Sequence, residues 1–178
     1  MPKQARWHEK VKQALKEIGK ERGYNVSESE KEMVLAAKFK MFDFKIKTYG
    51  SQRYELDIEK RKPHTFSIKP DGVWKKGHIY RAIFEVEYLK ASNSQKPMGK
   101  RKYSIGSFML SYLAMIQKSI KYTAFITNNE NLYREIVTFK HLIPLKHRKN
   151  TYTLCLKASD QPSIKQGLEE TFVKEWKI

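Results

Sequence analysis

Hydrophobic positions recur along the chain at helix and strand spacings, and they predict an alternation of helices and strands. Trp7, Val11, Leu15 and Ile18 lie at helical spacing within 7–22, and Gly23 is placed to end that helix. A short strand is expected over 24–30, and 31–38 carries no decisive pattern. Further periodic segments predict, in order, a helix over 103–119, a strand over 122–127, a helix over 129–139, a strand over 152–156 and a helix over 164–176.

Two segments between these elements predict β-hairpins. In 39–60, apolar residues alternate with polar ones in two arms around the turn signal Tyr49-Gly50-Ser51. In 66–88, a short first arm around Gly72-Val73-Trp74 precedes the turn residues 75–78 and a second arm rich in strand-forming residues. The sequence therefore predicts one α/β domain over 1–178, with a mixed sheet flanked by helices and 39–60 as a β-hairpin insertion.

The net charge of the chain indicates which class of binding partner to expect. The 178 residues include 36 Lys and Arg against 19 Asp and Glu, a formal net charge of +17. Such a surplus favours a polyanionic partner, and nucleic acid is preferred over a membrane surface because no segment has the pattern of a lipid-facing amphipathic helix. The alternative is a merely soluble, lysine-rich surface.

The cysteine count, the apolar runs and the glycine pattern indicate the cellular compartment and exclude some kinds of binding site. Cys155 is the single cysteine, which excludes an intrachain disulfide framework and a cysteine-based zinc site. The chain has no long apolar run and no signal-peptide core at its start, so we expect a cytoplasmic, intracellular protein. It also has no glycine-rich phosphate loop, so nucleotide-driven activity is not expected.

Three carboxylates of the second hairpin are the strongest chemical signal. With the turn centred near Gly77, Asp71 is expected opposite Ile83, and Glu85 and Glu87 follow on the second arm. Because side chains alternate along a strand, all three can share one face, where they would repel one another unless a divalent cation such as Mg²⁺ or Mn²⁺ were bound. Such a cation could polarise a phosphate and activate water. Alternating glutamates on a solvated face are the bland alternative.

The segment Pro70-Asp71 followed by Glu85-Val86-Glu87 resembles the signature of the PD-(D/E)xK nuclease superfamily, whose members have a restriction-endonuclease-like fold. The resemblance covers about two-thirds of the chain, Trp7 to Thr127, and its motif is short and degenerate. It implies an Mg²⁺-dependent DNA endonuclease in which Asp71 and Glu85 bind the metal, with the Val86 carbonyl as a third ligand.

One position departs from the family pattern. Glu87 stands where the family usually has Lys, although some restriction-enzyme branches carry an acidic residue there. Glu87 could orient the attacking water or bind a second metal, or the lysine could have migrated to Lys90, Lys100 or Lys102. The site could also be inactive and only bind DNA.

Several branches of the family add an acidic residue or a histidine from the first helix, which makes His8 and Glu9 candidates for a supporting role. The preferred interpretation of His8 is packing against Trp7, and Glu9 lies off the apolar face. Glu28 and Glu30 could reach the site from the first strand.

Basic clusters are the candidate DNA contacts, because phosphate contacts supply most non-specific affinity. Each cluster alone is also typical of a solvated face. The candidate residues are Lys75, Lys76, Lys100, Arg101, Lys102, Lys146, Arg148 and Lys149.

The expected substrate is double-stranded or branched DNA, and a homodimer would place two sites across a two-fold axis. The rival interpretations are a catalytically inactive DNA-binding module with a nuclease-like fold and an RNA-binding protein that uses its aromatic residues for stacking.

Overall fold

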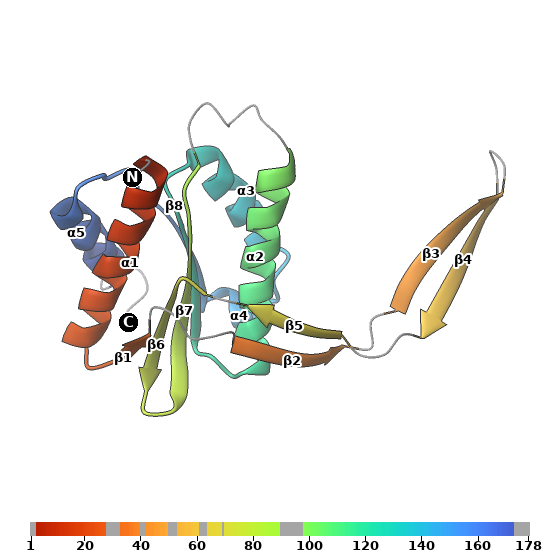
Figure 1. Ribbon diagram of the computed structural model, residues 1–178, viewed down its shortest axis with the longest axis horizontal. Coiled ribbons are helices and arrows are strands. Elements are labelled where there is room, and N and C mark those ends of the chain that lie inside the picture. The colour runs from red at the N-terminus through yellow and green to blue at the C-terminus, as the bar shows by residue number, and fades with distance from the viewer. Residues whose placement is uncertain are drawn as a thin grey trace. The chain divides into compact units, whose positions relative to one another are not determined.

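The structure is a computed structural model, and it describes residues 3–27, 33–39, 42–49, 53–60, 64–68, 70–89 and 98–172. The chain divides into two compact units, one formed by 1–33 with 68–178 and the other by 34–67. The larger unit is a mixed α/β structure around a five-stranded sheet (Figure 1).

The sheet has the order β1-β6-β7-β8-β9. Its strands are β1 (Asn25–Ser27), β6 (Gly72–Lys76), β7 (Ile79–Glu87), β8 (Tyr122–Thr127) and β9 (Thr151–Cys155). β1, β6 and β7 pair antiparallel, whereas β7, β8 and β9 pair parallel. Parallel neighbours need crossover connections, which the helices between them supply.

Helices cover both faces of this sheet (Figure 1). One face carries α1 (Lys3–Glu21) and α5 (Gln161–Thr171), and the other carries α2 (Met98–Gln117) and α3 (Glu130–Lys140). A four-residue helix, α4 (Leu145–Arg148), precedes β9. None of the helices in the described ranges is long and apolar enough to cross a membrane.

Alternation along β7 assigns its side chains to the two layers. Phe84 and Val86 enter the core between the sheet and the α1/α5 layer. Trp74 from β6 is buried in the same core, where its Nε1–H donates to the Leu15 carbonyl of α1 at 3.0 Å. Glu85, between Phe84 and Val86 in sequence, therefore belongs to the face that α2 covers.

The smaller unit holds the first predicted hairpin. β3 (Phe42–Tyr49) pairs antiparallel with β4 (Arg53–Lys60), and Ile46 lies opposite Leu56. A second pair is formed by β2 (Met33–Phe39) and β5 (His64–Ile68).

The mixed α/β class with a helix-flanked mixed sheet is confirmed, but several boundaries differ. The polar stretch before 103 carries no helical pattern, yet α2 begins at Met98. The sequence does not predict β5 or α4, and α5 begins three residues earlier than the helix expected over 164–176. These misses fall on short or polar segments, where apolar periodicity carries little information.

Candidate functional site

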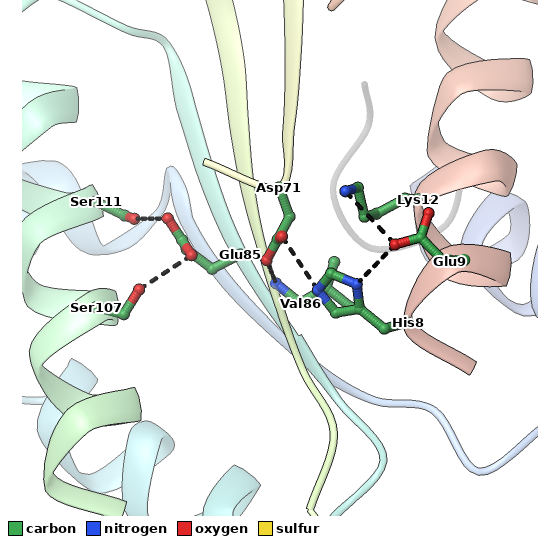
Figure 2. A network of polar contacts seen from close by, with 8 residues as sticks. All are labelled: His8, Glu9, Lys12, Asp71, Glu85, Val86, Ser107 and Ser111. Carbon is green, nitrogen blue, oxygen red and sulfur yellow. Dashed lines mark hydrogen bonds and ion pairs between the residues drawn. The ribbon is translucent and has the colours of Figure 1, made fainter. Parts of the chain in front are cut away.

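Asp71 lies at the start of the second hairpin, in the bend directly before β6. Its Oδ2 accepts a hydrogen bond from the Val86 backbone N–H at 2.9 Å, and its Oδ1 lies 3.1 Å from Nε2 of His8 on α1 (Figure 2). The carboxylate therefore adds a hydrogen bond to β7 just before the start of β6, and it connects the sheet to α1.

Glu85 is held by the opposite layer. Oε1 accepts a hydrogen bond from Ser111 Oγ at 2.9 Å, and Oε2 accepts one from Ser107 Oγ at 3.0 Å. Both serines lie on α2, one helical turn apart (Figure 2). Two hydroxyl donors thus satisfy a carboxyl group that is 9% exposed.

Burial raises the pKa of the Glu85 carboxyl to about 8, and the neighbouring charges of Asp71 and Glu87 act in the same direction. The hydrogen bonds from Ser111 and Ser107 act to lower it. Among the side chains that the structure describes, no lysine or arginine forms an ion pair with Glu85. Glu85 is a buried acid beside two like charges, an environment frequent at functional sites.

The hairpin register corrects one expectation. The structure pairs Gly72 with Phe84, which places Asp71 level with Glu85 rather than with Ile83. The two-residue turn Gly77-His78 and a bulge in β7 cause this difference, because both shift the centre of the hairpin toward the second arm.

The side chains of Asp71 and Glu85 also differ from expectation in the direction in which they point. Asp71 turns toward His8 of α1, while Glu85 turns toward α2, so these carboxyl groups do not point the same way (Figure 2). The reason is that Asp71 stands before the first residue of β6, where strand alternation does not constrain it.

His8 belongs to the site, and its interpretation as a residue that merely packs on Trp7 is wrong. The hydrogen bond to Asp71 raises the pKa of the His8 imidazole, and burial opposes this. Nδ1 of His8 lies 3.5 Å from Oε1 of Glu9, which in turn lies 3.8 Å from Nζ of Lys12. The chain Lys12–Glu9–His8–Asp71 therefore runs from the surface of α1 to the sheet (Figure 2).

Val86 and Glu87 complete the set that the sequence singled out. Because the N–H and C=O of a strand residue point to the same side, the Val86 carbonyl also faces the side of β7 on which Asp71 lies. Glu87 is half-buried at the end of β7 and lies near enough to Glu85 to act on its ionisation. Just beyond it, the side-chain amide of Asn128 pairs with the Leu89 backbone at 2.8 and 3.0 Å, which fixes the end of the strand.

The donor set can be tested against a divalent cation. In the part of the chain that the structure describes, no three His, Cys, Asp or Glu side chains are grouped to hold a metal ion. The chemistry of the donors nevertheless fits Mg²⁺ or Mn²⁺: two neighbouring carboxyl groups, a backbone carbonyl at the same edge, and a buried acid without a basic partner among the described residues. Asp71, Glu85 and the Val86 carbonyl are the groups that would hold such an ion.

The remaining predicted residues are distributed over the molecule. Nζ of Lys75 lies 4.4 Å from the Tyr80 ring centroid, Lys76 is exposed at the hairpin turn, and Lys146 and Lys149 are exposed around α4. Arg148 has a structural role, because its guanidinium donates to the His141 and Ile143 carbonyls. Two groups fall outside the description, the side chains of Lys100, Arg101 and Lys102 at the start of α2 and the whole of Glu28 and Glu30.

Sequence reasoning missed the serines that hold Glu85. Ser104, Ser107 and Ser111 recur at spacings of three and four within the apolar part of α2. That spacing places them on one face, so a polar stripe facing a buried partner was the available signal.

Comparison with protein-family models, with curated proteins and with solved structures finds no match to this chain.

Proposed function

We propose that this protein is a metal-dependent deoxyribonuclease that hydrolyses phosphodiester bonds of DNA, with Asp71 and Glu85 as the metal-binding carboxylates. The observation that carries the proposal is the placement of these two groups. They lie level in register at one end of a hairpin, where the charge of Asp71 acts on Glu85, although Glu85 is buried and has no basic partner among the side chains that the structure describes. Such a pair costs stability, because like charges oppose each other's ionisation. We interpret this cost as a sign that the pair has a function.

A divalent cation bound by Asp71, Glu85 and the Val86 carbonyl would polarise a scissile phosphate and make a nearby water more acidic. The chain's own groups prepare the site for this. Ser107 and Ser111 hold Glu85 in one orientation, and Val86 N–H and His8 hold Asp71. Glu87 is close enough to Glu85 to affect its ionisation, and orienting water is a role that the family resemblance leaves open for it.

The rest of the chain supplies affinity for the substrate. A net charge of +17 favours binding to the phosphate backbone, and exposed lysines lie on the hairpin turn and around α4. Two-strand cleavage by one site per subunit would need a dimer, which is part of the proposal.

A second candidate is a DNA-binding module without catalysis. It is favoured by the hydrogen bonds that already engage the carboxyl oxygens of Glu85 and Asp71. RNA binding through aromatic stacking is less well supported. Trp74, Phe84, Phe108, Phe125 and Phe172 are all fully buried and cannot stack on bases.

Metal binding separates the two main candidates. We expect the protein to bind Mn²⁺, detected by electron paramagnetic resonance of the free ion, and Asp71→Asn and Glu85→Gln each to remove the tightest site. Glu169→Gln, which neutralises an exposed carboxylate on α5, is the matched control and should keep it. Tight binding that persists in both site variants would place the metal elsewhere.

A further inference from the structure

A basic cavity lies on the α1 side of the sheet, away from Asp71 and Glu85. Its volume is about 380 Å³. The walls combine four cationic side chains with two aromatic ones, Arg22, Lys76, Arg81, Lys121, Tyr24 and Tyr122. All belong to the larger unit of the chain.

Local backbone features place Arg22 and Tyr24 at this cavity. The Tyr24 N–H donates to the Gly19 carbonyl and the Gly23 N–H to the Lys20 carbonyl, both at 2.9 Å. This Schellman arrangement ends α1 and needs the left-handed conformation of Gly23, whose φ is 74°. Tyr24 is then stacked on Trp74, with ring centroids 5.2 Å apart and planes at 12°.

The sheet brings the other cations to the same place. Trp74 pairs with Ala82 and Lys75 with Tyr80, so Arg81 is the extra residue of a β-bulge, a device that redirects a side chain. Ala82 and Tyr122 form the first pair between β7 and β8, so Arg81 and Lys121 each directly precede a residue of that pair. Lys76 is next to the hairpin turn, where Gly77 has φ 60°.

No described carboxylate compensates the charges of this cavity. Within the described part of the chain, no carboxylate forms an ion pair with any of the four cations. Two of them rest on rings instead: the Arg22 guanidinium lies 5.9 Å from the Phe172 ring centroid, and Lys121 Nζ lies 4.7 Å from that of Tyr122. Four converging cations in a concave, ring-lined space suit an anion with several oxygens.

The cavity is distinct from the carboxylate site. Both are built on α1, but His8 and Arg22 are fourteen residues apart, which corresponds to roughly 20 Å along a helix axis. A ligand of the cavity therefore need not touch the carboxylates.

We propose that this cavity binds a phosphate group carried by a nucleotide or by a nucleic-acid strand. Arg22, Arg81, Lys76 and Lys121 neutralise the phosphate, and Tyr24 or Tyr122 provides a ring against which the sugar or base packs. The inference goes beyond the proposed hydrolysis and holds whether or not the chain cleaves DNA.

The test is a titration of the full chain at low ionic strength, followed by ¹H–¹⁵N NMR. Three probes are compared: inorganic phosphate, adenosine 5′-monophosphate, and a thymidine dinucleotide whose only phosphate is a diester. Each is titrated into the parent, Arg81→Gln, Lys121→Gln and the control Lys118→Gln. Lys118 and Lys121 are exposed lysines three residues apart in the same connection, so their variants lose the same charge.

We expect the largest shifts at the amides of Gly23, Lys76 and Arg81, and binding weakened about fivefold to tenfold by Lys121→Gln, as for loss of one charge-assisted contact. Lys118→Gln should change it less than about twofold. Tighter binding of the monophosphate than of the diester identifies a free nucleotide or a strand end as the source, and equal binding identifies the interior of a strand. Equal weakening by Lys118→Gln and Lys121→Gln, or shifts spread over the surface, would overturn the inference. Because Lys121 is exposed, its variant keeps the test valid even if Arg81→Gln fails to fold.

Discussion

Asp71 and Glu85 lie level at the end of one hairpin, yet opposite layers of the molecule hold them. His8 of α1 contacts Asp71, and Ser107 and Ser111 of α2 donate to Glu85. The two carboxyl groups therefore connect both helical layers to the same end of the β6–β7 hairpin. A change in the charge of these carboxyl groups should therefore alter contacts with both helical layers.

Because Glu85 is a buried acid with a raised pKa, we expect the stability of the protein to depend on pH. Below pH 4.5 the folded and unfolded states both hold the Glu85 proton, whereas between pH 4.5 and about 8 only the folded state holds it. Unfolding then releases a proton, so stability should fall as pH rises through this range, by up to about 1.4 kcal/mol per pH unit. Urea denaturation of metal-free protein between pH 4.5 and 8.5 measures this slope.

The variants for this experiment isolate Glu85. Glu85→Gln should lose most of the slope, and the exposed-site control Glu169→Gln should keep it. A smaller decline will remain above pH 6.5, because the raised pKa of His8 also makes stability fall as that group loses its proton. Parallel profiles for the parent and Glu85→Gln would show that Glu85 is ionised in the folded protein.

His8 should titrate as a partner of Asp71. In an NMR titration we expect its pKa above 6.5 in the parent and clearly lower in Asp71→Asn, because the hydrogen bond to Asp71 is the largest cause of the shift. Glu9→Gln should lower it less, since Glu9 has a smaller effect on His8 than Asp71 has. A His8 pKa that responds equally to both changes would contradict the pairing.

The serines of α2 should matter for stability and for the site. Ser111→Ala removes a hydroxyl that is buried and bonded to Glu85, so we expect a loss of about 1–3 kcal/mol in the free energy of unfolding. It should also raise the pKa of Glu85 further, since that hydrogen bond lowers it. Ser163→Ala on the exposed surface of α5 is the control, and a loss as large there would argue against a special role for Ser111.

The contact between α1 and the sheet gives a matched pair of glycine variants. A Cβ at Gly19 would lie 2.5 Å from Trp74 Nε1 and 2.6 Å from Val26, whereas one at Gly106 of α2 would meet nothing within 4 Å. Gly19→Ala should therefore destabilise the protein by about 1–3 kcal/mol through overpacking. Gly106→Ala should stabilise it by about 0.5–1 kcal/mol through helix propensity. Thermal denaturation of both variants compares them, and similar effects would contradict the close approach of α1 to Trp74.

Much of this architecture could be read from local patterns. Strong periodicity around Val11 and Leu15 located α1, and the run of apolar residues from Tyr122 to Thr127 located β8. The start of α2 could not be read in this way, because residues from Met98 to Lys102 are mostly polar and carry no apolar stripe.

The residues of the candidate site could be singled out from the sequence, but their contacts could not. Asp71 and Glu85 follow from a motif, whereas their register depends on a bulge at Arg81 that no local pattern marks. The contact of His8 with Asp71 depends on how α1 packs on the sheet, which is a tertiary property. Local sequence patterns therefore indicate which residues are candidates, but they do not indicate which residues these candidates contact.

The measurement that tests the central claim most directly is cleavage of supercoiled plasmid and of a four-way DNA junction, with Mg²⁺, Mn²⁺ or chelator. It is run with the parent, Asp71→Asn, Glu85→Gln and Glu169→Gln. We predict nicking or linearisation of at least one substrate that requires the metal, falls at least about a hundredfold in the two site variants, and is unchanged in Glu169→Gln. Cleavage that survives in Asp71→Asn and Glu85→Gln, or a parent protein that binds both DNA substrates and cuts neither, would contradict the proposed nuclease.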